Sequence, residues 1–282
     1  MPGTPPAATL PAPRHVKALG LATAYVELGP PDAEPVVFVH GYASNHLAWK
    51  ENLLDLSRSY RAIALDLAGH GGTAKPLAPY TITYYARHVA SFLEALKLER
   101  VTLVGVSLGG AIAGTVALRW PERLARLVLV DAAGVGRKGQ SWASRRRFLP
   151  ALFWQVLGRP KRPVLRRFLE EAIFASPELA TDAVIDEMVD AHQNSRLAAL
   201  FTGFTLMLPD AYLYPKLSRI QLPTLIVWGS EDRTFPVSDA YDAARQIPGA
   251  RVEVLEGVGH VPMQERPQAF NRILRDFIEN AS

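Results

Sequence analysis

A serine between two glycines stands at the end of an apolar run, in the pentapeptide GVSLG (105–109). The run before it (101–106) has the pattern of a buried strand, and a helical pattern follows at once. A direct turn from strand to helix strains the backbone of its central residue. It leaves space only for minimal side chains at the positions two residues before and two residues after that residue. The Ser107 hydroxyl would then project from the turn, with the Leu108 backbone N–H at the positive end of the helix. This context predicts a nucleophilic serine rather than an ordinary glycine turn.

A serine hydroxyl is a poor nucleophile by itself and needs a base, which an acid must orient. Among seven histidines, His260 lies in a glycine-rich loop (257–262) between the last strand pattern and the last helix pattern. From there it can reach over the sheet to Ser107, so we predict His260 as the base. The remaining histidines lie in the N-terminal tail, in helical patterns, or in loops and turns, which favour other roles: His15, His40, His46, His70, His88 and His192.

The acid is expected after a strand that comes between the serine and the histidine in the chain. Asp232, in GSEDRTFP (229–236), ends an apolar strand and leaves room for one helix and one strand before the histidine. Glu231 is adjacent but would face another direction. Asp131 also ends a strand and stays a rival, because either aspartate could hold the histidine tautomer if the geometry permits. Asp232 is the predicted acid.

An oxyanion hole needs a second backbone amide besides that of Leu108. The first long strand pattern ends in His40-Gly41-Tyr42, where the glycine permits a sharp bend that turns an N–H inward. We predict the Tyr42 N–H as this donor. His40 is then expected to fix the loop by hydrogen bonding rather than to act as a base.

The elements that must position these residues alternate between strand and helix. Helical patterns at 84–98, 111–120, 239–246 and 268–279 fall between short apolar runs. Near-continuous apolarity indicates strands covered on both faces, so the fold class is α/β with a mostly parallel sheet and right-handed crossovers. The predicted strand runs are 35–41, 61–69, 101–110, 124–134, 224–232 and 250–257.

The alternation lapses once, between residues 134 and 217, where the pattern is helical and interrupted by prolines. We predict that this insert is a helical cap over the C-terminal strand ends, where open α/β sheets place their ligands. The predicted core domain is then 20–133 and 218–282. Residues 1–19 are expected to form a flexible tail, because five prolines fall within the first thirteen positions.

The composition of the 282 residues, with 49% hydrophobic and 21% charged, excludes wholesale disorder. No run approaches the roughly 18 consecutive apolar residues of a membrane-spanning helix. The absence of cysteine excludes disulfides, thiolate zinc sites and a cysteine nucleophile. The N-terminus also lacks a basic segment followed by a continuous apolar one, so we predict no signal peptide and a cytoplasmic location.

The net charge of +4 is concentrated in one part of the cap. Residues 137–167 carry ten basic residues and no acid, and residues 168–190 carry seven acids and no base. Such a block is unlike a nucleic-acid surface and favours a solvated helical face that pairs with the acidic stretch. Because aromatic side chains alternate with the arginines, weak contact with an anionic membrane stays open as an alternative.

Five motifs together resemble the α/β-hydrolase superfamily over about residues 20–280: HGYASN (40–45), DLAGHGGTAKP (66–76), GVSLGG (105–110), GSEDRTFP (229–236) and GVGHVP (257–262). The resemblance implies an eight-stranded, mostly parallel sheet with the cap inserted after the sixth strand, and Ser107, Asp232 and His260 as a catalytic triad. Within the superfamily the chain is similar to small capped bacterial carboxylesterases and to hydrolases that cleave C–C bonds of ring-opened aromatics. Haloalkane dehalogenases and epoxide hydrolases of this fold use an aspartate where Ser107 stands, which argues against both.

The expected reaction is hydrolysis of short- to medium-chain carboxylic esters through an acyl-enzyme, which requires no metal and no cofactor. A small-molecule ester is the expected partner, with the chain as a monomer or homodimer. A C–C bond hydrolase, a monoacylglycerol-type lipid esterase, a cofactor-free perhydrolase or a non-enzymatic ligand receptor are the alternatives. The residues expected to bind substrate are mostly apolar side chains of the cap: Trp154, Phe201, Phe204, Met207 and Tyr212, together with Val261.

Overall fold

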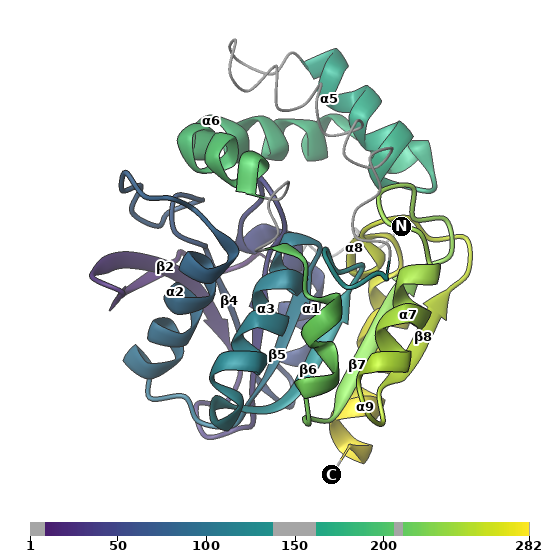
Figure 1. Ribbon diagram of the computed structural model, residues 1–282. Helices are drawn as coiled ribbons and strands as arrows, with labels where there is room; N and C mark the ends of the chain where they lie inside the picture. The colour runs from purple at the N-terminus through teal and green to yellow at the C-terminus, as the bar shows by residue number, and fades with distance from the viewer. Residues whose placement is uncertain (1–8, 138–161, 206–210, 282) are drawn as a thin grey trace, which may run out of the picture.

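The computed structural model describes residues 9–137, 162–205 and 211–281, and within α6 it describes only the backbone of 192–194, 196–197, 199 and 203–205 (Figure 1). Eight strands form one sheet in the order β1-β2-β4-β3-β5-β6-β7-β8. β1 and β2 are antiparallel to their neighbours and the other six strands are parallel, so the predicted sheet is confirmed. The strands are β1 (Arg14–Ala18), β2 (Leu21–Leu28), β3 (Pro35–Val39), β4 (Arg61–Leu65), β5 (Val101–Val106), β6 (Leu124–Val130), β7 (Thr224–Gly229) and β8 (Arg251–Leu255).

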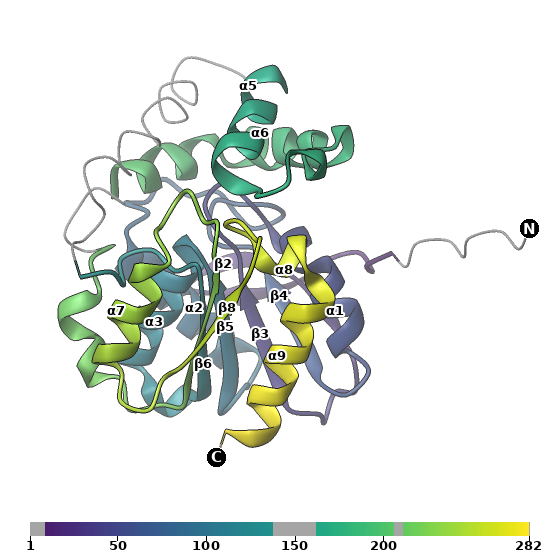
Figure 2. The ribbon, with the colours of Figure 1, turned by 90° about the vertical axis from the view of Figure 1, so that its right-hand side faces the viewer.

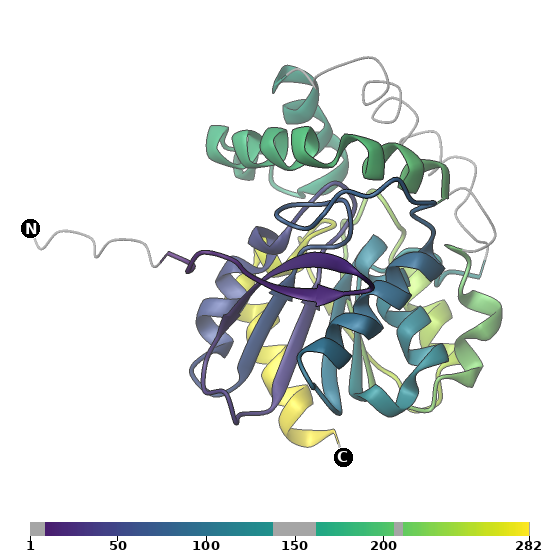
Figure 3. The same ribbon diagram turned by 90° about the vertical axis from the view of Figure 1, so that its left-hand side faces the viewer.

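The first two strands form a hairpin at one edge of the sheet (Figure 3). Strand β1 therefore overturns part of the prediction of a flexible tail over residues 1–19. Leu19 and Gly20 both have positive φ, 49° and 78°, and a turn with two such residues matches the twist of the strands it joins. The pairing of Arg14–Ala18 with the next strand supplies backbone partners that the proline-rich composition did not reveal.

Helices cover both faces of the sheet (Figure 2). On one face lie α2 (Ile82–Ala95), α3 (Leu108–Arg119) and α7 (Ser238–Gln246), and on the other lie α1 (Lys50–Leu56) and α9 (Pro267–Asn280). Neighbouring strand residues contribute to opposite layers: Val37 packs with the first group and Val36 with the second. This double coverage explains the continuous apolar runs, since the central strands β3 to β7 are largely buried on both sides.

Most of the described chain between β6 and β7 is helical and lies over the C-terminal ends of the strands (Figure 1). This part comprises α5 (Arg162–Phe168), the π-helical turn η3 (Leu169–Ile173), the short turn η4 (Pro177–Leu179) and the long α6 (Asp182–Thr205). The turn η6 (Tyr214–Arg219) leads back to β7, and its Leu217 packs in the same core layer as α3 and α7. α5, η3 and α6 share a small apolar core of their own that includes Leu165, Leu169 and Ile185.

Four arginines of the basic block lie in the described residues. Three of them pair with carboxylates, and the fourth, Arg137, donates its backbone N–H to Asp242. Arg162 pairs with Asp182, Arg166 also pairs with Asp182, and Arg167 pairs with Glu171. These contacts are the expected pairing between the basic block and the acidic stretch. The rest of the block, residues 138–161, lies outside the described residues. Among the described helices, none is both long and apolar enough to cross a membrane.

Replacement of Gly109 by alanine tests how tightly the start of α3 packs on the sheet. A Cβ at this position would lie 2.3 Å from the backbone oxygen of Val39, which cannot move without disturbing β3. We expect Gly109→Ala to lower the free energy of unfolding by about 3 kcal/mol or to abolish soluble expression. The measurement is urea denaturation followed by circular dichroism.

Gly114→Ala in the same helix is the matched control. Its Cβ would meet only the end of the Leu213 side chain, at 2.9 Å, and a flexible side chain can shift. Alanine favours helix over glycine by about 0.5–1 kcal/mol, so this variant should change stability by less than about 1 kcal/mol. Equal stability of the two variants would contradict the proposed close approach of α3 to β3.

Candidate active site

Ser107 occupies the turn between β5 and α3 with φ 55° and ψ −117°, a strained conformation for a residue with a side chain. A Cβ on Gly105 would lie 2.2 Å from the Gly109 oxygen, so both flanking glycines are sterically required. Hydrogen bonds to β6 and the segment after it hold the turn: the Ser107 N–H donates to Val130 O at 2.9 Å, and Ala133 N–H donates to Ser107 O at 3.0 Å. The sequence reasoning placed the serine in this kind of turn for the same steric reason.

His260 and Asp232 are in direct contact on neighbouring loops after β8 and β7. Nδ1 of the histidine lies 2.9 Å from Oδ2 of the aspartate, and their side chains are only 5% and 0% exposed. The Asp232 Oδ1 accepts N–H groups from Thr234 and Phe235 at 2.7 and 3.1 Å. With Nδ1–H donated to the carboxylate, Nε2 of His260 is left to accept a proton.

Neither rival acid contacts the histidine in this way. Glu231 is half exposed and forms a loose pair with Arg233 at 3.9 Å. Asp131 lies beside Asp232, but its Oδ1 accepts the Gly229 N–H, at 3.0 Å.

Ser107 and His260 line one cavity of about 1100 Å³. Its floor comes from the strand ends and includes Gly41, Tyr42 and Val261. Its walls come from the cap, and they are largely apolar: Leu165, Phe168, Leu169, Ile173, Phe174, Leu179, Val184, Met188 and Ala191. Charged side chains at the same cavity are Lys50, Glu51, Arg167, Glu171 and Glu187. Burial raises the pKa of Glu187 above its ordinary value.

The two candidate oxyanion donors lie close to the serine. A Cβ on Gly41 would be 3.4 Å from the Ser107 Cβ, which places the backbone of the β3 loop against the serine. Tyr42 follows in that loop and lines the cavity. Leu108 is the first residue of α3, so its N–H lies at the positive end of the helix dipole. An oxyanion hole requires backbone N–H groups close to the nucleophile, and the β3 loop and the start of α3 both lie close to Ser107.

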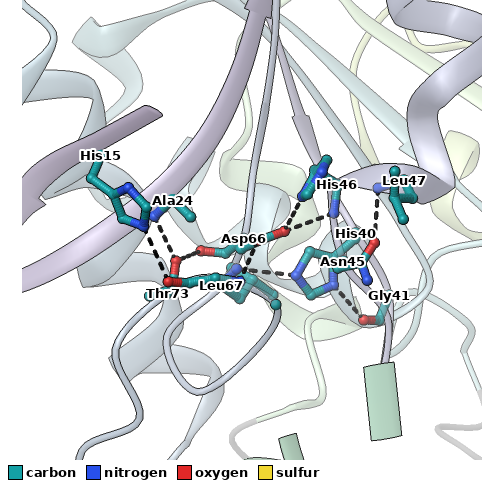
Figure 4. Close-up of polar contacts among 12 residues, drawn as sticks. His15, Ala24, His40, Gly41, Asn45, His46, Leu47, Asp66, Leu67 and Thr73 are labelled. Carbon is teal, nitrogen blue, oxygen red and sulfur yellow. Dashed lines mark hydrogen bonds and ion pairs between the residues drawn. The ribbon is translucent and has the colours of Figure 1, made fainter. Parts of the chain in front are cut away.

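A buried hydrogen-bond network fixes this loop (Figure 4). Asp66 accepts both the backbone N–H and the ring Nδ1–H of His46 on Oδ1, each at 2.8 Å, and Gly72 N–H on Oδ2. Burial alone would raise the pKa of Asp66, but the His46 hydrogen bond and the nearby histidines hold it below its ordinary value. His40 Nε2 accepts Leu67 N–H at 3.0 Å, and burial lowers the pKa of His40. His40 therefore fixes the loop, as predicted; the sequence reasoning missed the part played by Asp66.

The cap is bonded directly to the loops that carry Asp232 and His260, through η3 and the residues after it. His260 N–H donates to Ile173 O at 2.7 Å, and the Thr234 hydroxyl donates to Ala172 O at 2.9 Å. Glu265, in the short helix α8 (Pro262–Glu265), accepts Gly259 N–H on one oxygen and Ala175 N–H on the other, both at 2.9 Å. Glu265 thus joins the histidine loop to the cap, a role that only the tertiary contacts reveal.

The predicted substrate residues are distributed differently from the cavity walls. Val261 lines the cavity. Phe201 is 37% exposed and stacks on Tyr80. Tyr212 donates its hydroxyl to the backbone oxygen of Arg137. Neither Phe201 nor Tyr212 lines the cavity that contains Ser107. Trp154 and Met207 lie outside the described residues, and for Phe204 only the backbone is described. The walls come instead from α5, η3 and the first half of α6, because these elements pack over Ser107.

Sequence spacing showed no compact ligand pattern for a metal, but the fold creates one small group. Within the described residues, ligand atoms of Asp131, Asp232 and His260 lie within 4.8 Å of one another. A cation there would compete with the Nδ1–H of His260 for the same carboxylate oxygen. The hydrogen-bonded arrangement of His260 and Asp232 is the one that serine chemistry uses, and that chemistry requires no metal.

Replacement of Glu265 tests whether the link between the cap and the histidine loop matters for the reaction. Glu265→Ala leaves two amides without acceptors and frees the His260 loop, so we expect kcat on a nitrophenyl ester to fall about tenfold or more. Glu265→Gln keeps one acceptor oxygen and should give an intermediate kcat. Glu256→Ala, an exposed glutamate just upstream in the chain, is the control and should leave kcat unchanged. Equal kcat in all three variants and the unmodified chain would contradict the positioning role.

Comparisons with known proteins agree with this fold. The sequence model of the alpha/beta hydrolase fold family matches residues 34–267. The chain is 27% identical to 3-oxoadipate enol-lactonase 2 of Acinetobacter baylyi over 255 residues, 90% of this chain and 92% of that protein. It is 27% identical to monoacylglycerol lipase abhd6-B of Xenopus laevis over 274 residues, 91% of this chain and 79% of that one. A meta-cleavage product hydrolase of Pseudomonas fluorescens superposes with a TM-score of 0.82 at 25% identity, covering 95% and 98% of the chains. With most of its length matched and its fold shared with these hydrolases, the chain belongs to the alpha/beta hydrolase fold family and is a hydrolase.

Proposed function

We propose that the protein is a serine esterase that hydrolyses carboxylic esters through an acyl-enzyme. The observation that carries this proposal is the shared cavity: strained Ser107 lines it together with His260, whose Nδ1 lies 2.9 Å from Asp232. Strained backbone concentrates at sites of chemistry, and these three residue types form the constellation that activates a hydroxyl.

In the proposed cycle, Nε2 of His260 takes the Ser107 proton as Oγ attacks the ester carbonyl carbon. The carbonyl oxygen becomes an oxyanion and accepts the backbone N–H groups of Tyr42 and Leu108; one such donor contributes about 3 kcal/mol. His260 then gives its proton to the departing alcohol, and the Ser107 ester remains. Water, deprotonated by His260, attacks this ester and releases the acid. Asp232 stabilises the imidazolium at both stages.

The size and the apolar walls of the cavity favour an ester whose apolar acyl group makes most of the contacts with the protein. The cavity's volume of about 1100 Å³ slightly exceeds the roughly 300–1,000 Å³ of small-molecule sites, and its cap walls are largely aliphatic and aromatic. Charged groups such as Lys50 and Glu187 at the same cavity suit the polar alcohol part of an ester. Short- to medium-chain esters are the first candidates.

A monoacylglycerol-type lipid ester is the second candidate. The same apolar walls would take a longer acyl chain, and a relative named monoacylglycerol lipase is 27% identical. A C–C bond hydrolase would use the same three residues but must hold the carboxylate of a ring-opened dienoate. Among the described residues that line the cavity, Lys50 and Arg167 are the cations that could bind such a carboxylate. Arg167, however, is 77% exposed and already pairs with Glu171 at 2.8 Å. We therefore place ester hydrolysis first.

The triad is tested with Ser107→Ala and Asp232→Asn on p-nitrophenyl esters. Ser107→Ala removes the nucleophile, so we expect kcat/KM to fall by about 10⁴-fold or more, and Asp232→Asn by about 10³-fold or more. A fluorophosphonate should add covalently to Ser107 in the unmodified chain, as located by peptide mass spectrometry. Circular dichroism checks that each variant is folded. Full activity of Ser107→Ala, or an adduct on another residue, would overturn the proposed mechanism.

Met188→Trp tests which part of the cavity holds the acyl chain. Met188 lines the cavity from α6, and a larger side chain there shortens the available space. We expect kcat/KM for an octanoate ester to fall about tenfold while that for an acetate ester changes less than about threefold. Phe201→Ala, on the same helix but away from the cavity, is the control and should leave the ratio of kcat/KM for the two esters unchanged.

A parallel assay on a ring-opened dienoate distinguishes C–C bond hydrolysis from ester hydrolysis. Faster turnover of the dienoate than of any ester would reverse our ranking of the two functions.

A further inference from the structure

Asp131 is a buried acid that the proposed reaction does not use. It follows β6, which lies between β5 and β7 in the sheet, so it is placed between Ser107 and Asp232. It is 0% exposed, and its φ of 40° is a left-handed conformation that aspartate and asparagine tolerate better than most residues. The burial of this acidic side chain requires an explanation, because an isolated charge is rarely buried.

The contacts of Asp131 leave one of its oxygens unused. Oδ1 accepts Gly229 N–H at 3.0 Å, whereas Oδ2 is buried with no hydrogen-bond partner among the described residues. An oxygen of Asp131 lies within 4.8 Å of an oxygen of Asp232 and of a ring nitrogen of His260. Oδ2 is therefore the atom that can carry a proton in this group.

Asp232 has room for one more donor. An ionised carboxylate offers about four acceptor positions. The N–H groups of Thr234 and Phe235 and the Nδ1–H of His260 occupy three of them. A hydroxyl from Asp131 would complete the set.

The charges around Asp131 favour its neutral form. Burial raises its pKa well above the ordinary value, and the negative charge of Asp232 raises it further, with Glu265 in α8 adding to both. A protonated His260 would add a positive charge nearby, but that imidazole is already paired with Asp232. Two adjacent buried carboxyl groups cannot both ionise, so one of them keeps a proton.

We propose that Asp131 remains protonated in the working enzyme and donates its Oδ2–H to the carboxylate of Asp232. Asp131 is thus a positioning residue: it holds Asp232 in place and reduces the negative charge that His260 experiences, rather than acting as a second acid for the histidine. The proposal rests on the proposed role of the Ser107, His260 and Asp232 group.

The experiment compares Asp131→Asn with Asp131→Ala through the pH profile of kcat/KM, whose acid limb reports the pKa of the free enzyme's base. Asparagine keeps a neutral donor, so kcat/KM should fall only about threefold and the acid limb should stay within about 0.3 pH unit of its original position. Alanine removes the donor, so kcat/KM should fall about thirtyfold. Its acid limb should move up by about 0.5 pH unit, because Asp232 then stabilises protonated His260 more strongly.

A downward shift of about 1 pH unit in Asp131→Asn would mean that Asp131 is ionised, and it would overturn the proposal. An unchanged rate and profile in Asp131→Ala would overturn it as well. Infrared difference spectra of the unmodified chain and Asp131→Asn at pH 7 give a readout independent of turnover and of the alanine variant's folding. The carbonyl band of a protonated carboxylic acid should be present in the spectrum of the unmodified chain and absent from that of Asp131→Asn. Its absence from both spectra would refute the protonated state of Asp131. This band does not depend on activity, so it separates failure of this proposal from failure of the Ser107 mechanism.

Discussion

The close contact between the start of α3 and the ends of β3 and β5 holds Ser107 in a conformation that an isolated chain would avoid. Gly109 packs against the Val39 carbonyl and Gly105 against the Gly109 carbonyl, with no space for a side chain at either position. The strain at Ser107 persists because β5 is entirely buried and α3 packs into the main apolar core beside it. Core packing therefore maintains the strained backbone that carries the Ser107 hydroxyl at the C-terminal end of β5.

The order of the strands determines which side chains meet this hydroxyl. β5, β6, β7 and β8 are consecutive neighbours, all parallel, so the residues after their C-terminal ends gather at one edge. Ser107, Asp131, Asp232 and His260 follow these four strands in that order. The edge consequently places two carboxyl groups together, and their different surroundings separate their roles: Asp232 accepts two amides and an imidazole, whereas Asp131 accepts one amide. Environment rather than residue type distinguishes the two aspartates.

The cap contributes to the site in two ways. Its apolar side chains form the cavity walls, and its π-helical turn bonds to the loops that carry the acid and the histidine. Turns of this kind interrupt regular helical bonding and leave backbone carbonyls for other partners. Ala172 and Ile173 use theirs to accept from Thr234 and His260. A few backbone contacts thus join the cap that walls the cavity to the loops that carry Asp232 and His260.

The sequence alone determined the α/β class, six of the eight strands and the candidate reactive residues, because glycine spacing and apolar runs are local consequences of sterics and burial. It did not show β1 and β2, whose residues become strands by antiparallel pairing with each other and, for β2, with β4. Nor did it show that Phe201 and Tyr212 lie away from the cavity while Met188 lines it, since packing of the cap decides which side chains face inward. The relation between Asp131 and Asp232 was equally hidden. A carboxyl group's partners and charge depend on groups distant in the chain, and only the tertiary structure brings those groups within reach.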